Sequence, residues 1–288
     1  NIGSIFKSQG EYTKALDHYK RSLKIAEKLN DKKVISQAMN NIGMIYNELS
    51  NYEEALRHFN LSVNIKKHIG DKRGLADGYN NIGLIYEEYG DFEKAIKFYN
   101  KSLKIKEEIN DKQGIAASLN NIGIIYEYQG DYVKALEYYQ LSLKLKIEVG
   151  HKENIASAYN NIGHILMYQA NYEMAFDHYK LSLKMRKKLG NKQGIASSLN
   201  NIGLLFENQG FYDIAFDHYH QSLKIREKIG YKKGISGTLI NIGFIYFKQK
   251  KYSQAIIYGN KALDLAKEIG VIKRTREASD LLYKSYKK

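Results

Sequence analysis

The sequence predicts an all-α solenoid built from antiparallel helix pairs. The main observation is a phrase, Asn-Asn-Ile-Gly, that returns every 40 residues without any change of step. Between these phrases, apolar residues are spaced by three and four, which is the spacing of one helix face. A fixed period of this size indicates a repeat architecture, in which each unit contacts only its neighbours. Complete copies lie at 40–43, 80–83, 120–123, 160–163 and 200–203, and partial copies at 1–3 and 240–243.

Residues 111–150 show how one period divides into two helices. Leu119 and Ile122 belong to the apolar face of the first helix, and Gly130 then interrupts the pattern. An acidic residue follows this glycine, as expected where one helix ends and the next begins with an N-cap. Tyr139 lies on the apolar face of the second helix. Glycine or asparagine ends each second helix, because these residues accept the left-handed backbone.

The sizes of the predicted core residues also recur. Gly123 and Ala135 have a glycine and an alanine at the equivalent places in all seven copies. Tyr139 has a large residue at most equivalent places. Small residues opposite large rings predict close approach of the two helices of a pair.

The elements follow in order from this period. Residues 1–270 are predicted to form the solenoid, and residues 271–288 form one more helix, which either caps the stack or continues it. The chain begins inside a copy of the repeat, so we expect a fragment of a longer protein. The predicted repeats are 1–30, 31–70, 71–110, 111–150, 151–190, 191–230 and 231–270.

The spacing Leu119-x2-Ile122-Gly123-x2-Tyr126, followed by Ala135-x3-Tyr139, resembles the tetratricopeptide repeat. The period is 40 instead of about 34 and the closing proline is absent, as expected if the second helix is about one turn longer. Long-period arrays of this kind resemble those of kinesin light chain, spindle-orientation adaptors and bacterial sensor proteins such as histidine kinases. The Lys-, Asn- and Ile-rich composition favours the bacterial group.

The resemblance implies a right-handed superhelix, with the first (A) helices lining a concave groove and the second (B) helices outside. The family's groove positions then fall on a row of asparagines, whose amides can both donate and accept hydrogen bonds. We expect this row to bind the backbone of a peptide, while one asparagine of each Asn-Asn pair ties neighbouring helices together. The row comprises Asn41, Asn81, Asn121, Asn161, Asn201 and Asn241.

Specificity is expected from groove positions that vary between repeats. A mostly apolar row includes Leu84, Ile124, His164 and Leu204. A second set, expected to make the groove acidic in its middle, includes Glu88 and Glu127, and Lys248 is expected to make its C-terminal end basic. The resemblance also places Tyr128 in the groove. These rows would suit a segment with apolar anchors and some basic residues.

Composition limits the other functions. The net charge is +14, and residues 231–288 hold 13 Lys/Arg against 4 Asp/Glu. Only 7 of the 45 basic residues are arginine, which is few for bidentate phosphate binding and disfavours nucleic acid. Cysteine is absent, and no apolar run is long enough to cross a membrane. No catalytic or cofactor motif is present, and His18, His58, His178 and His218 recur too far apart to share a metal.

The sequence therefore predicts a non-enzymatic protein-interaction scaffold, without cofactor or metal, that binds a peptide or partner segment in its groove. Its location is expected to be cytoplasmic. One alternative is a sensor segment of a larger bacterial signalling protein. A second is binding of nucleic acid or of an acidic partner through the basic C-terminal region. The sequence does not indicate the partner or the oligomeric state.

Overall fold

The structure is a computed structural model that describes residues 2–288, and these residues form fifteen α-helices and no strand. The predicted all-α solenoid class is confirmed for this part of the chain. The partial phrase that opens the sequence begins at residue 1, which lies outside the described residues.

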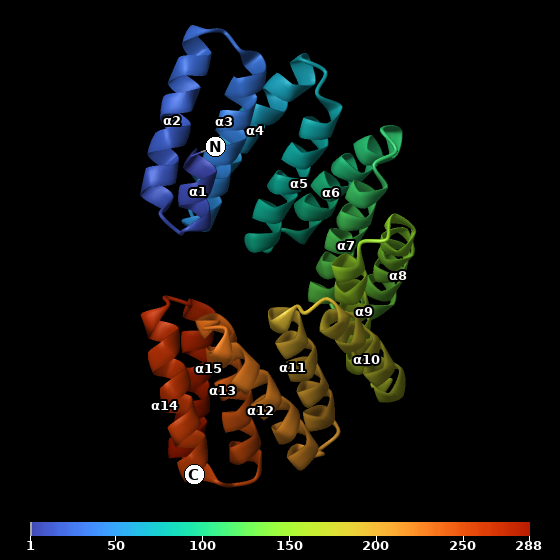
Figure 1. The fold of residues 1–288 in the computed structure, drawn as a ribbon, viewed down its shortest axis with the longest axis vertical. Coiled ribbons are helices and arrows are strands. Elements are labelled where there is room, and N and C mark those ends of the chain that lie inside the picture. Colours follow the sequence, from blue (N-terminus) through green and yellow to red (C-terminus); the bar gives the residue numbers. More distant parts are fainter. Residues whose placement is uncertain (1) are drawn as a thin grey trace. The chain divides into compact units, whose positions relative to one another are not determined.

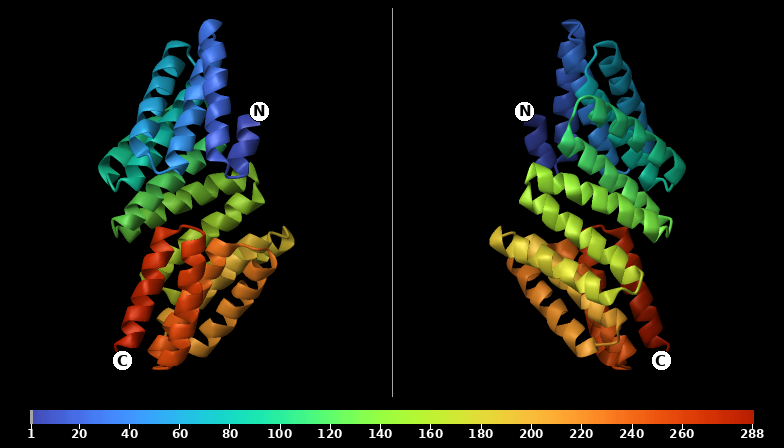
Figure 2. Two further views of the ribbon diagram at one scale, coloured as in Figure 1. Left: turned by 90° about the vertical axis from the view of Figure 1, so that its left-hand side faces the viewer. Right: turned by 90° about the vertical axis from the view of Figure 1, so that its right-hand side faces the viewer.

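The helices divide into two compact units, residues 1–149 and 150–288. Figure 1 labels the helices, and Figure 2 shows each unit from two further sides. The first unit contains α1 (Ile2–Ser8), α2 (Tyr12–Lys28), α3 (Lys32–Glu48), α4 (Tyr52–His68), α5 (Lys72–Glu88), α6 (Phe92–Glu108), α7 (Lys112–Tyr128) and α8 (Tyr132–Val149). The second contains α9 (Lys152–Tyr168), α10 (Tyr172–Lys188), α11 (Lys192–Asn208), α12 (Tyr212–Lys228), α13 (Lys232–Lys248), α14 (Tyr252–Glu268) and α15 (Ile272–Tyr286).

Within each unit, every helix packs against the next one along the chain (Figure 1). The odd-numbered helices α1 to α13 carry the repeated phrase or a partial copy of it, and they are called A helices here. The even-numbered helices are called B helices. In the second unit α9 also contacts α11, α11 contacts α13, and α13 contacts α15. Successive A helices of the second unit are therefore neighbours, and in the first unit asparagine hydrogen bonds join α3 to α5 and α5 to α7. The sides that carry these asparagines are called the A-helix face of each unit.

The turns between helices all use a left-handed residue. In the α7–α8 turn, Gly130 has φ +76°, and its N–H donates to the Glu127 carbonyl at 3.0 Å. The Asp131 N–H donates to the Tyr126 carbonyl at 2.9 Å, which completes a Schellman ending. The Asp131 carboxylate then accepts from the Lys134 N–H at 3.1 Å and caps α8, as the sequence predicts.

The close contact between the helices of a pair depends on the recurring glycine. A Cβ atom added to Gly123 would lie 2.8 Å from the ring of Tyr139, so the space that a side chain would need is occupied by the ring. The same distance is 2.7 Å from Gly83 to Tyr99 and from Gly203 to Tyr219. The predicted packing of small residues against large rings is therefore confirmed.

The last repeat replaces this contact with another one. Gly259 stands where other repeats carry the ring, and Leu281 from α15 fills the space, 2.5 Å from an added Cβ at Gly243. Leu282 lies 2.8 Å from an added Cβ at Gly259. Tyr283, which occupies the glycine position of α15, is exposed instead of facing a B helix. The glycine–ring pattern is therefore absent from the last repeat because leucines of α15 pack between α13 and α14 in place of the ring.

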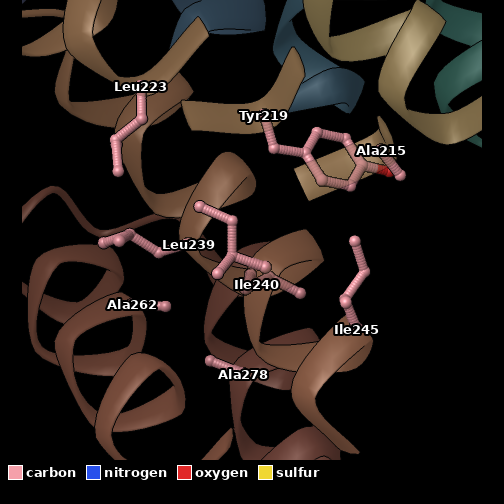
Figure 3. Packing of buried hydrophobic residues seen from close by; sticks show 9 residues of the cluster. Ala215, Tyr219, Leu223, Leu239, Ile240, Ile245, Ala262 and Ala278 are labelled. Atoms are coloured by element: carbon pink, nitrogen blue, oxygen red, sulfur yellow. The ribbon is translucent and has the colours of Figure 1, made fainter. Parts of the chain in front are cut away.

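Figure 3 shows the core of the second unit, where side chains from α12, α13 and the neighbouring helices meet. Tyr219 points toward the labelled Ala215, and Ile240 and Ile245 of α13 lie across from α12. Alanines such as Ala262 and Ala278 are small, so the neighbouring helices can pack closely at these positions. The core is thus a succession of interhelix layers, each made by adjacent helices only.

The turn after α13 offers a test of the turn geometry. Lys250 has φ +60°, a conformation that costs a residue with a Cβ about 1–2 kcal/mol. We predict that Lys250→Gly raises the free energy of unfolding by about 1 kcal/mol, measured by urea denaturation. The control Lys261→Gly, at an exposed position within α14, should destabilise. Equal effects of the two substitutions would contradict the assignment of backbone strain to Lys250.

Candidate functional site

The repeated asparagines form hydrogen-bonded pairs between successive A helices. Asn121 Nδ2 donates to Asn80 Oδ1 at 3.0 Å, and Asn81 Nδ2 donates to Asn40 Oδ1 at 3.1 Å. In the second unit Asn201 donates to Asn160 at 3.0 Å and Asn241 to Asn200 at 3.4 Å. Each pair thus joins the second asparagine of one repeat to the first asparagine of the repeat before it.

These pairs leave hydrogen-bonding groups unused on the A-helix face. Asn81, Asn121 and Asn201 are half-buried, and their Oδ1 atoms accept no hydrogen bond from residues 2–288. An amide oxygen has two lone pairs and an amide nitrogen two N–H groups, so each pair retains both an acceptor and a donor. Asn41 and Asn161 are also half-buried, on α3 and α9.

The predicted apolar row is only partly available to a ligand. Leu84 packs against the cluster of Tyr99 and Ile122, and Leu204 packs against the cluster of Figure 3. His164 lies edge-on to Tyr168, with 4.7 Å between the ring centroids. Ile124 is half-buried on α7. These residues contribute to packing between repeats as well as to the surface.

The glutamates at the ends of the A helices are tied to the core. The hydroxyl of the buried Tyr139 donates to Glu127 at 2.7 Å, and the hydroxyl of Tyr99 donates to Glu87 at 2.6 Å. Burial raises the pKa of Glu87, although the Tyr99 hydrogen bond opposes this effect. Glu127 is therefore held by the fold, so its presence on the A-helix face has a structural reason.

Two other predicted residues are exposed in the first unit. Glu88 ends α5, and Tyr128 ends α7. The Tyr128 ring stacks on Phe92 with 5.9 Å between centroids, which fixes its position while leaving one face in solvent. Both side chains are accessible to a partner.

The B helices also carry a column of buried basic side chains that the sequence pattern did not predict. Lys66, Lys106, Arg186 and Arg226 are each less than a tenth exposed, and Lys146 is at the equivalent position. Each lies seven residues after the buried aromatic residue of its helix, as Lys106 follows Tyr99, so it lies on the same helix face. That spacing was the signal available in the sequence.

The column reaches the A helix that follows. Lys106 Nζ donates to Ser118 Oγ at 3.2 Å, and Arg226 Nη1 donates to Thr238 Oγ1 at 2.5 Å and to the Gly234 carbonyl at 2.8 Å. Thr238 in turn donates to Asn200. The buried cations are thus connected to the polar side of the A helices.

A hollow of about 360 Å³ lies in the first unit between α5 and α7, beside the Asn80–Asn121 pair. The buried Lys106 lines it together with Arg73, Asp77 and Asp111. The hollow is the point where the basic column meets the A-helix face.

The recurring histidines pack against aromatic rings. His18 stacks on Phe6 with 5.3 Å between centroids, and His218 stacks on Phe206 at 5.9 Å. Among residues 2–288, no group of His, Cys, Asp or Glu is arranged to hold a metal ion. None of the helices described is both long and apolar enough to cross a bilayer.

Ion pairs within the fold use part of the positive charge of residues 231–288. Lys248 lies 3.3 Å from Glu207, and Lys284 lies 2.7 Å from Asp280. Lys232 pairs with Glu268, and Arg274 pairs with Glu277. Three of these four acids belong to the same segment, so residues 231–288 keep most of their excess positive charge.

Lys146 allows a test of burial in the basic column. Its Nζ donates to Asn120 Oδ1 at 3.2 Å, and burial lowers the pKa of Lys146 from 10.5 to about 8. Between these values the unfolded chain binds a proton that the folded chain has lost, so folding stability rises with pH. We predict that Lys146→Met reduces this rise, measured by urea denaturation across the same pH range. The control is Lys144→Met, an exposed lysine on α8, and equal slopes in the two variants would contradict the prediction.

A model of the tetratricopeptide repeat matches residues 1–68, 34–108, 74–148, 114–188, 154–228 and 194–268. No curated protein matches the chain in sequence.

Solved structures share the fold at low sequence identity. The apo form of RapI has a TM-score of 0.76 at 17% identity, over 93% of this chain and 96% of that chain. The quorum sensor NprR from B. thuringiensis, also in its apo form, has a TM-score of 0.76 at 18% identity, over 92% and 74%. A Rap protein complexed with competence and sporulation factor has a TM-score of 0.71 at 16% identity, over 93% and 74%.

Proposed function

Because the chain belongs to the tetratricopeptide repeat family, we propose that it is an interaction scaffold that holds a peptide or an extended partner segment on its A-helix face. The observation that carries this proposal is the set of unused amide groups on the asparagine pairs. The pairs Asn40–Asn81 and Asn80–Asn121 offer an acceptor and a donor at each step between repeats. A peptide backbone presents the complementary groups at every residue.

The pairing supports binding because it fixes the amides before a ligand arrives. An asparagine that donates to a neighbouring repeat has already lost rotamer freedom, so less entropy is lost when its second group bonds a ligand. The exposed Glu88 and Tyr128 then contact side chains of the bound segment. Leu84, Ile124, His164 and Leu204 contribute apolar contact where packing between repeats leaves them accessible.

A sensor role is the second candidate, and the comparisons favour it. NprR is a quorum sensor, and the Rap protein above is complexed with competence and sporulation factor. In a sensor, the bound segment would change the arrangement of the helix pairs. Hydrogen exchange that slows only around the A helices on binding would support a plain scaffold, and changes spread over the B helices would support the sensor.

The test is a peptide-array screen of the full chain and of two variants. The first variant changes three asparagines of the A helices to alanine: Asn81, Asn121 and Asn201. The control variant changes two exposed asparagines of the B helices to alanine: Asn60 and Asn100. We predict that the first variant weakens binding of the array hits by roughly tenfold or more, because each lost hydrogen bond contributes about 0.5–1.5 kcal/mol.

The control variant should bind as the wild type does. Circular dichroism on all three proteins establishes that each is folded. If the folded triple variant binds every hit as well as the wild type, the asparagines serve the packing alone and the proposal is wrong.

A further inference from the structure

The hollow beside the Asn80–Asn121 pair has a buried charge on its wall. Lys106 is 4% exposed, and its ammonium carries three N–H donors. One of them bonds Ser118 Oγ at 3.2 Å. No carboxylate in residues 2–288 lies within 4.0 Å of this ammonium, so the charge has no direct ion pair.

A buried ammonium without a counter-charge is costly, because it has lost water without gaining an opposite charge. Burial lowers the pKa of Lys106, and the more distant Asp77 and Asp111 oppose that change only in part. The site would therefore gain from an anionic group placed against the two remaining N–H donors.

The same chain shows such a group at the equivalent place two repeats later. Arg186 occupies the position of Lys106, and its Nε lies 3.2 Å from Glu153 Oε1. The Arg186 guanidinium also donates to the Gly194 carbonyl and to Ser198 Oγ, the counterpart of Ser118. The second unit thus supplies an internal carboxylate to its buried cation.

The first unit lacks this internal carboxylate. The counterpart of Glu153, 80 residues earlier, is Arg73, which lines the hollow. A base therefore stands where the second unit has the acid, and a cavity of about 360 Å³ remains in front of Lys106.

The two acids that line the hollow are placed differently. Asp111 accepts from the Gly114 N–H at 3.0 Å and caps α7, so it is engaged by the helix. Asp77 is exposed on α5. Its charge would repel an entering anion, whereas Arg73 would attract one.

We propose that this hollow is a subsite for the carboxylate of an acidic residue in the bound segment, with Lys106 as its counter-charge and Asn80 and Asn121 as further donors. The proposal deepens the function above and rests on the A-helix face being the binding surface. It assigns at least one Asp or Glu to the ligand, opposite the step from α5 to α7.

The carboxylate is tested directly with small probes on the isotope-labelled full chain. The probes are N-acetylglutamate α-amide, the matching N-acetylglutamine α-amide, and N-acetylglycine, which carries a terminal carboxylate. Nuclear magnetic resonance follows the backbone amides of Gly114 and Ser118 and the side-chain amides of Asn80 and Asn121. We predict saturable shifts at millimolar glutamate probe and none with the glutamine probe. Equal binding of N-acetylglycine would identify a terminal carboxylate as a second source of the same group.

Four variants sharpen the test. Lys106→Met should abolish the shifts, and Lys106→Arg should retain them, because arginine fills this position in α10. The control Lys66→Met removes a buried lysine in the same register that does not line the hollow. It should bind as the wild type does. Asp77→Asn should tighten binding by removing the repelling charge.

The proposal is overturned if no carboxylate probe shifts these resonances, if the glutamine probe binds as well, or if Lys106→Met binds unchanged. A different result would contradict the proposed function: the triple asparagine variant would bind the array peptides as well as the wild type does. Array hits that depend on the asparagines but contain no excess of Asp or Glu would overturn the subsite and leave the scaffold in place.

Discussion

The contact between a glycine of each A helix and the aromatic ring of its B helix is the constraint on which the structure depends. Gly123 has no room for a side chain because the ring of Tyr139 lies against it. This contact sets how close the two helices of a pair lie, and every turn must return the chain to it. The glycine and the ring therefore recur in the sequence with the same 40-residue period.

The same ring connects the core to the A-helix face. Tyr139 is buried, yet its hydroxyl reaches Glu127 at 2.7 Å. Tyr219 does the same with Glu207. One side chain therefore packs the pair and positions a carboxylate, so packing and surface chemistry repeat with a single period.

Most of the fold could be predicted from the sequence because each helix depends on local patterns and on its nearest neighbours. The turn at Gly130 and the cap at Asp131 are local features, and the structure has both. The packing of the last repeat was harder to predict. Gly259 replaces the aromatic ring there, and the space that the ring would fill is occupied by Leu281 from a different helix. The pattern of residues within one repeat does not show which residue of another helix replaces a missing ring.

The candidate site could be predicted only in part. The repeated phrase placed the asparagines on the A helices, but the partner of Asn121 is Asn80, 41 residues earlier, and the sequence does not show which group each amide bonds. The basic column was missed because lysine and arginine are ordinarily surface residues. Their spacing from the buried ring is regular, but only the structure shows that the space around them is closed.

The buried cations also bear on how the repeats recognise one another. A purely aliphatic seam between one pair and the next would tolerate sliding by a helical turn, because one leucine can replace another. Arg226 instead bonds the Gly234 carbonyl and Thr238 Oγ1, so its position along α13 is fixed by two specific acceptors. A displaced helix would leave the guanidinium in an apolar environment, at a cost that a hydrophobic seam does not impose. The buried cations thus fix the register between each B helix and the A helix that follows it.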